Sequence, residues 1–372
     1  MPESRKFENI MKKPLKIIHA ADLHLDSPFE VLGERAALRR SEQRELLQRI
    51  AELCREREAD MLLLAGDLLD TGSAYAETFS ALCSAFGSLD CPVFISPGNH
   101  DFYSPASPYA AGTLPENVHI FRGGWECVEL AEKGVRLYGA AFTDVACPPL
   151  LRDFHAPRQE GIINIGLLHG DLNPIADSRY CPISATELAV SGFDYLALGH
   201  RHAYSGLLSV EGTVCAYPGC PEGRGFDECG EKGVLYVEID SDGVRGEFIP
   251  TARRHYEIIE LDISEGIPSC PQGRGEDIVR IVLTGESDTA PDLAALQKEW
   301  GENFFALQLR DRSKLRRELW EDSAQDSLKG LFLRKMREKY DSAPTEAEKQ
   351  KITEALRWGL AALEGGEAVS AV

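Results

Sequence analysis

KIIHAADLHL (residues 16–25) is an apolar run that gives way to acidic and imidazole side chains. Two later segments repeat this arrangement, ADMLLLAGDLLD (59–70) and CPVFISPGNHD (91–101). The stretches between them, residues 34–58 and 75–89, have the composition and spacing of helices. We therefore expect a β-α-β-α-β order, with parallel strands joined by right-handed crossovers.

The rest of the chain changes character after residue 115. Short apolar runs separated by Gly, Pro and Asp turns predict many strands in a more antiparallel second half. Residues 256–311 read as a β-β-α-β unit, and residues 327–340 and 345–364 read as helices. The predicted fold class is α/β (α+β), a four-layer αββα sandwich of two packed sheets with helices outside. A small β-β-α-β C-terminal domain and a helical tail follow it.

The composition shifts predict four parts of the chain. A boundary is expected near IPTARR (249–254), after the last strand of the sandwich. The expected parts are a flexible leader (1–15), the main domain with the sandwich (16–252), a small capping domain (253–325) and a C-terminal helical tail (326–372).

Composition excludes several classes of protein. The chain has 372 residues, 43% hydrophobic and 27% charged, as in ordinary globular proteins. No run approaches 18 consecutive apolar residues, so no membrane span is expected. The net charge of −20 argues against coating nucleic acid by bulk charge, but it leaves room for a local site containing metals. The ten cysteines form no C-x-x-C pair, which favours reduced thiols and a cytoplasmic protein.

Polar motifs stand where the apolar runs end. Because the ends of parallel strands meet at one edge of a sheet, their side chains are expected to converge. Residues at i and i+2 point to the same side of a strand, whereas neighbours such as Asn99 and His100 diverge. The candidate residues are Asp22 and His24 in D-L-H, Asp67 in G-D, Asn99, His100 and Asp101 in G-N-H-D, His169 in L-L-H-G, and His200 and His202 in G-H-R-H.

The mixture of ligand types predicts the metal and the chemistry. Imidazole, carboxylate and amide groups together suit Mn, Fe or Zn better than Mg or Ca. Seven candidate ligands are too many for one tetrahedral ion, but they suit two divalent ions about 3.5–4 Å apart that share a carboxylate. Such a pair lowers the pKa of a bridging water, so that hydroxide attacks a phosphoester at neutral pH.

In these motifs the sequence resembles the calcineurin-like metallophosphoesterase superfamily. Its signature, D-x-H, G-D, G-N-H-[DE], H and G-H-x-H, is present in order over residues 22–202. The motif HAADLHLDSPF (19–29) and the Y-P-G after G-H-R-H are similar to sequences of the DNA repair exonuclease branch of this superfamily. The resemblance implies a metallophosphoesterase sandwich fold. It also implies manganese, the metal that enzymes of the family usually use.

The resemblance also implies a role for each motif residue. Asp67 would bridge the two ions. His100 would contact the scissile phosphate and assist the leaving oxygen, oriented by Asp101. The first ion would be held by Asp22, His24, Asp67 and His202, and the second by Asp67, Asn99, His169 and His200.

Four further polar residues have two readings each. Asp26 either faces the metals and substrate or caps the turn at Ser27. Arg224 either contacts a substrate phosphate or is a solvated loop residue. Asp70 and Asp171 fit turn or loop positions better than ligand positions.

Three functions are compatible with these observations. The resemblance implies a Mn-dependent DNA exonuclease or endonuclease in DNA repair. The acidic net charge supports an alternative, a phosphoesterase for nucleotides or phosphoproteins. The chain also lacks the P-loop motif G-x-x-x-x-G-K-[ST]. In the family an SMC-type ATPase supplies that motif, so the third reading is a subunit that docks such a partner through its C-terminal helices. Members of the branch often form homodimers, so a homodimer is a further candidate.

Overall fold

The computed structural model describes residues 13–174, 177–287, 290–314 and 323–363. Contacts divide the chain into two compact units, residues 1–255 and 256–372. Most of the expected leader lies outside the described residues. The finer division into four parts stays a prediction.

The first sheet of unit 1 has the strand order β14-β13-β1-β2-β3-β4. Strands β1 to β4 are parallel, whereas β13 runs antiparallel to β1 and pairs with β14 as a hairpin. The strands are β1 (Leu15–Ala20), β2 (Met61–Leu64), β3 (Val93–Ile95), β4 (Val118–Ile120), β13 (Gly233–Asp240) and β14 (Gly243–Pro250).

The second sheet has the order β11-β12-β10-β7-β6-β5. Its four central strands are parallel, and only the edge strands β11 and β5 are antiparallel. The strands are β5 (Glu126–Leu130), β6 (Val135–Gly139), β7 (Ile163–His169), β10 (Tyr195–Gly199), β11 (Leu208–Val210) and β12 (Thr213–Ala216). The expectation of a more antiparallel second half was therefore wrong for this sheet. All seven residues of β7 are buried, as is typical of a parallel strand covered on both faces.

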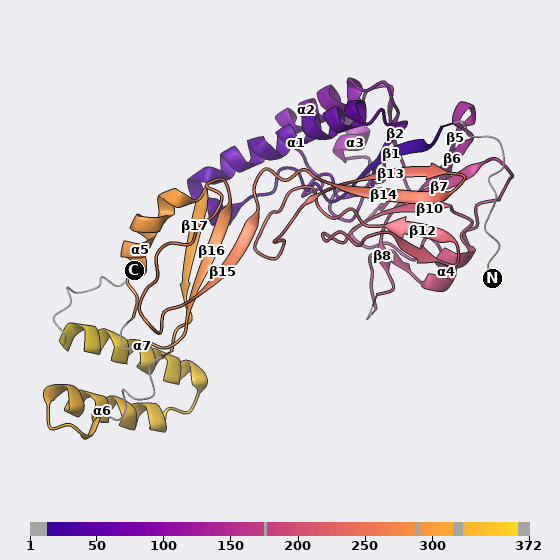
Figure 1. The fold of residues 1–372 in the computed structure, drawn as a ribbon. Coiled ribbons are helices and arrows are strands. Elements are labelled where there is room, and N and C mark those ends of the chain that lie inside the picture. The colour runs from indigo at the N-terminus through magenta and orange to yellow at the C-terminus, as the bar shows by residue number, and fades with distance from the viewer. Residues whose placement is uncertain (1–12, 175–176, 288–289, 315–322, 364–372) are drawn as a thin grey trace. The chain divides into compact units, whose positions relative to one another are not determined.

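Unit 1 has the predicted four layers (Figure 1). Apolar residues of both sheets, including Leu63 and Leu167, form one core between the sheets. A second core joins the first sheet to α1 (Ala36–Glu56) and α2 (Ala76–Gly87). A third joins the second sheet to α4 (Ala185–Val190). The predicted αββα sandwich is thus confirmed. The short helix α3 (Pro108–Ala111) and the two-residue strands β8 (Asp171–Leu172) and β9 (Pro182–Ile183) lie in the connections.

Unit 2 follows the predicted β-β-α-β order. Parallel strands β15 (Tyr256–Asp262), β16 (Ile278–Thr284) and β17 (Ala306–Asp311) pack with α5 (Leu293–Trp300). The helices α6 (Leu328–Ser342) and α7 (Glu346–Leu363) pack on each other through Leu333, Met336, Leu356 and Leu360. None of the helices in the part of the chain that the structure describes is long and apolar enough to cross a membrane.

Candidate metal centre

The candidate residues stand at the carboxyl ends of parallel strands in both sheets. Asp22 and His24 follow β1, and Asp67 follows β2. His169 is the last residue of β7, and His200 follows β10. Packing of the two sheets brings these ends together. Backbone contacts across the sheets confirm the approach, since the N–H of His200 lies 3.1 Å from both carboxylate oxygens of Asp22.

Glycines allow this close approach. A Cβ added to Gly199 would lie 1.7 Å from the Ala65 carbonyl oxygen. A Cβ on Gly66 would lie 2.4 Å from Nδ1 of His169, and the φ of Gly66 is +86°. Both positions therefore require glycine for the sheets to meet at this edge.

The backbone at the ligands is not extended, which corrects the strand-alternation argument. The φ angles of Asp22, His24 and Asp67 are 55°, 43° and 51°, all in the left-handed region. Such angles are uncommon for residues other than glycine and cluster at functional sites. Asp22 and His24 do meet, but in an irregular segment after β1 whose backbone N–H groups bond to the carbonyl oxygens of residues 66–68.

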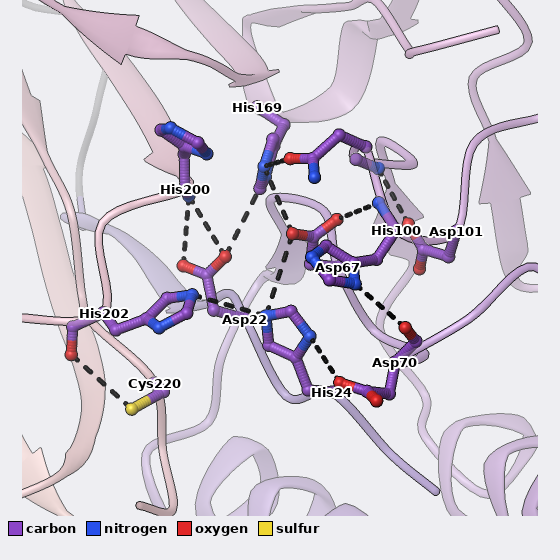
Figure 2. Close-up of polar contacts among 12 residues, drawn as sticks. Asp22, His24, Asp67, Asp70, His100, Asp101, His169, His200, His202 and Cys220 are labelled. Atoms are coloured by element: carbon purple, nitrogen blue, oxygen red, sulfur yellow. Dashed lines mark hydrogen bonds and ion pairs between the residues drawn. The ribbon is translucent and has the colours of Figure 1, made fainter. Parts of the chain in front are cut away.

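Three overlapping groups of side chains could hold a metal ion. Within each group the candidate ligand atoms lie within 4.8 Å of one another. Asp67 and Asp22 each belong to two groups, and Figure 2 shows them side by side at the centre of the cluster. Among the residues described, the groups are Asp22–His24–His202, His24–Asp67–His100 and Asp22–Asp67–His169.

Asp67 has the surroundings of a shared ligand. Its Oδ2 lies 3.4 Å from Nε2 of His169 and 3.7 Å from Nε2 of His24, and its Oδ1 accepts the backbone N–H of His100 at 2.9 Å. Burial alone would raise the pKa of Asp67, but the imidazoles and this N–H outweigh it and lower the pKa. Burial and the neighbouring Asp67 charge raise the pKa of Asp22.

His169 shows that a cation fits the site. Its Nδ1 lies 3.0 Å from the Ala65 carbonyl oxygen, so Nδ1 carries the proton of the neutral ring. The lone pair of Nε2 then faces Oδ1 of Asn99 at 3.0 Å and Oδ2 of Asp67 at 3.4 Å. Three acceptors directed at one point repel each other unless a cation lies among them. The donor set therefore fits a divalent metal.

The same argument holds for His24 and His202. Nδ1 of His24 lies 3.2 Å from the Asp70 carboxylate, and Nδ1 of His202 lies 2.7 Å from the carboxylate of Glu228. Each ring therefore turns its Nε2 toward the site, where the two Nε2 atoms are 3.3 Å apart. A metal ion between them would bind both lone pairs.

The ring of His200 lies apart from these groups. Its imidazole packs against His169 and Tyr180, with ring centroids 5.2 and 5.1 Å apart. Figure 2 shows the ring directed away from Asp22. Burial and the neighbouring His169 lower its pKa to about 4. The structure thus brings the backbone of His200 to the cluster, but not its side chain.

His100 and Asp101 diverge, as expected of neighbours. The exposed His100 ring lies 4.8 Å from the His24 ring, and its Nδ1 is 2.9 Å from the Asp70 carbonyl oxygen. Asp101 does not orient that ring, which corrects the expectation. Its carboxylate is buried and accepts hydrogen bonds from a hydroxyl and three backbone N–H groups, those of Tyr109, Gly98, Leu68 and Leu69. Asp101 therefore fixes the loops around the site.

Asp26 and Arg224 occupy neither of their two expected positions. Asp26 accepts the backbone N–H of Tyr75 at 2.9 Å and the hydroxyl of Thr78 at 2.5 Å, so it holds the start of α2. Arg224 pairs with Asp70 at 3.1 Å and with Glu228 at 2.7 Å. Its guanidinium is bound within the protein.

The sequence reasoning missed two carboxylates, Asp70 and Glu228. Asp70 was read as a turn residue, but its carboxylate contacts His24. The spacing in GDLLD, three residues after Asp67, was the available signal. Glu228 had no signal of its own, because it is 26 residues beyond His202 in a loop.

Comparisons with known proteins agree with this site. A model of the family "Calcineurin-like phosphoesterase" matches residues 15–204, which include every proposed metal ligand. The uncharacterised metallophosphoesterase YhaO of Bacillus subtilis is 32% identical over 268 residues, 68% of this chain and 65% of YhaO. The match therefore spans less than two thirds of YhaO. The DNA double-strand break repair protein Mre11 of Methanopyrus kandleri is 24% identical over 336 residues, 81% of this chain and 71% of Mre11. The family match covers half of the chain, and the protein belongs to the calcineurin-like phosphoesterases, metal-binding hydrolases that act on phosphoester bonds.

Proposed function

We propose that this protein is a dinuclear-metal phosphodiesterase that cleaves DNA with manganese, as an exonuclease or endonuclease in DNA repair. The observation that carries the proposal is one cluster in which two carboxylates and the Nε2 atoms of three imidazoles face one another. Their lone pairs outnumber the hydrogen-bond donors that the described residues place among them. The similarity to Mre11, described as a DNA double-strand break repair protein, supports DNA as the substrate. Ten cysteines without a C-x-x-C pair support a cytoplasmic location.

The proposed ligands divide into two overlapping sets. Asp67 would be shared, in keeping with its place in two groups. Bound divalent ions supply positive charge to the phosphoryl oxygens and lower the pKa of the attacking water. The first set is Asp22, His24, Asp67 and His202, and the second is Asp67, Asn99, His169 and the His200 side chain, which would have to turn inward.

His100 would act as a general acid. Its Nδ1 bonds the Asp70 carbonyl, so the proton that the ring gains or loses is carried on Nε2. The ring is exposed, so a leaving oxygen can reach it. Nε2 would protonate that oxygen as the P–O bond breaks.

A substrate panel tests the function. The full chain is incubated with MnCl₂ and linear duplex DNA, bis(p-nitrophenyl) phosphate or p-nitrophenyl phosphate, with the Asp67→Asn variant as the control. The proposal predicts Mn-dependent cleavage of DNA and of the diester by the wild type alone. Hydrolysis of the monoester with no cleavage of DNA would contradict it.

A phosphoesterase for nucleotides or phosphoproteins is the second candidate. The net charge of −20 favours it, because an acidic surface repels long polyanions. In the substrate panel this candidate predicts that the monoester is the preferred substrate.

The C-terminal helices are the proposed attachment to an SMC-type ATPase. Leu328 and Leu331 of α6 and Trp358 and Leu363 of α7 are between 40% and 69% exposed. Large apolar side chains at a surface favour contact with a partner. Copurification with the ATPase that survives deletion of residues 326–372 would contradict this attachment. A homodimer is also proposed, and sedimentation of the purified chain tests it.

A further inference from the structure

Arg224 lies between two carboxylates that belong to different parts of the chain. Its Nη1 donates to Oδ1 of Asp70 at 3.1 Å, and its Nη2 donates to Oε1 of Glu228 at 2.7 Å. Its backbone N–H donates to the other Glu228 oxygen at 2.7 Å. The side chain is 19% exposed, so these contacts are largely shielded from water.

Both carboxylates are also the partners of proposed metal ligands. Oδ1 of Asp70, which accepts from Arg224, lies 3.2 Å from Nδ1 of His24. Oε1 of Glu228, which also accepts from Arg224, lies 2.7 Å from Nδ1 of His202. The Arg224 guanidinium therefore holds one oxygen of Asp70 and one of Glu228. These two oxygens in turn contact the imidazoles of His24 and His202.

The contacts determine which nitrogen of each ring is available. A carboxylate beside Nδ1 keeps the proton there and leaves Nε2 as the ligand atom. Such partners also set the orientation of the ring, and their loss typically weakens metal binding by about 10–100-fold. His24 and His202 belong to the same candidate group with Asp22, so their alignment bears on one ion of the pair.

We propose that Arg224 is a positioning residue that clamps Asp70 and Glu228, and thereby holds His24 and His202 ready to bind the first metal ion. This inference rests on the proposed dinuclear site. It replaces the expected contact between Arg224 and the substrate phosphate. Arg224 acts chiefly through the two carboxylates, and its Nη2 also lies 3.2 Å from Nδ1 of His202. It touches no reacting atom.

Metal binding, measured without substrate, tests the clamp. Metal-free protein is titrated with MnCl₂, and free Mn²⁺ is followed by its electron paramagnetic resonance signal. We expect Arg224→Gln to weaken one of two Mn²⁺ sites by about 10–100-fold and to leave the other unchanged. Arg224→Lys should lose affinity as well, because one ammonium cannot span both carboxylates. Full affinity in the lysine variant would overturn the clamp.

Arg201→Gln is the matched control. Arg201 also pairs with a carboxylate near the cluster, Asp171 at 2.8 Å. Within the described residues, this ion pair involves neither His24 nor His202. We expect this variant to bind Mn²⁺ like the wild type. An equal loss of Mn²⁺ affinity in both variants would overturn the proposal, because removing any positive charge near the cluster would then weaken metal binding.

Coupling between residues gives a second measurement. If Arg224 acts through Glu228, the loss caused by Arg224→Gln should be smaller in a Glu228→Gln background than in the wild type. Strictly additive losses would overturn the proposal. If Arg224→Gln does not fold, as judged by circular dichroism, Glu228→Gln alone should show the selective loss at one site. A wild type that fails to bind two ions would refute the dinuclear function itself, independently of the variants.

Discussion

At the scale of single residues, Asp67 is where the two proposed ligand sets meet. Its carboxylate is almost fully buried and faces His169 and His24 on one side. We predict that Asp67→Asn removes both metal ions, because the amide supplies no negative charge to share. Elemental analysis after gel filtration measures this. Asp171→Asn, in β8 and outside the three groups, should keep both ions. Two ions in the Asp67 variant would refute its bridging role.

His100 separates catalysis from metal affinity. We predict that His100→Ala keeps both ions but slows DNA cleavage by about 10²–10⁴-fold, the usual contribution of a general acid. A diester with a very good leaving group should be slowed less, because it needs no proton. Turnover rates and metal content are measured together.

His155 provides the control for that variant. It is another exposed histidine, and its Nδ1 lies 2.6 Å from the Val190 carbonyl oxygen, away from the proposed ligands. His155→Ala should behave like the wild type. Loss of a metal ion from the His100 variant would instead make His100 a ligand, as its group with His24 and Asp67 allows.

At the scale of elements, Gly199 at the end of β10 sets the distance between the two sheets. We predict that Gly199→Ala destabilises the protein by about 1–3 kcal/mol, because the new Cβ would overlap the Ala65 carbonyl. The shift should also break the contact between His200 and Asp22 and reduce metal content. Thermal unfolding and elemental analysis measure the two effects.

Gly123 is the matched glycine. A Cβ there would lie 3.6 Å from Thr143, which is ordinary contact. Gly123→Ala should therefore unfold like the wild type. Equal melting temperatures for both alanine variants would show that the sheets can separate at no cost.

Helix α1 is joined to distant loops by buried charges. Its Glu42 is 1% exposed and pairs with Arg254 at 2.5 Å and with Arg39 at 3.3 Å. Arg39 also pairs with Glu222, in the loop that leads to Arg224. Replacing the Glu42 carboxylate by an amide removes the negative charge that faces these two guanidinium groups, so we predict that Glu42→Gln destabilises the protein by up to about 3–5 kcal/mol at pH 7.

The effect of Glu42 should depend on pH. Burial raises its pKa, but Arg254 and Arg39 outweigh burial and the pKa is lowered. A lowered pKa means that the stabilisation is complete above the ordinary glutamate pKa of about 4.3. It is lost as the pH falls below that value, through the lowered pKa. Denaturant unfolding from pH 7 to pH 3 should show the variant approaching the wild type. Exposed Glu52→Gln on the same helix should change little at any pH.

At the scale of the whole molecule, the proposed ligands all lie in unit 1 and the two terminal helices in unit 2. We predict that deleting residues 326–372 leaves the number of bound ions and the cleavage of bis(p-nitrophenyl) phosphate unchanged. Elemental analysis and absorbance assays measure both. Loss of either would show that the centre depends on the helices.

Strand ends could be predicted from the sequence because an apolar run followed by Asp or His marks them locally. Asp22, His24, Asp67 and His169 were found in that way and do meet. The parallel centre of the second sheet was missed, although INIGLL (163–168), the nearly continuous apolar run of β7, is typical of a strand buried on both faces. Glu228 and the clamp on Asp70 could not be found, because their contacts join loops far apart in the chain. The left-handed backbone at Asp22 likewise occurs together with contacts to distant residues, the carbonyl of Gly66 and the N–H of His200.

The placement of β13 beside β1 has a consequence for synthesis on the ribosome. Residues 15–19 pair with residues 235–239. One edge of the first strand therefore stays unpaired until more than half of the chain has been synthesised. When synthesis has just passed His202, the nascent chain contains all the proposed ligands, but β13 has not yet been made and one edge of β1 is unpaired. Exposed edges recruit other strands. Translation that pauses between residues 202 and 233 should therefore favour aggregation, and a chaperone that covers this edge should raise the yield of native protein.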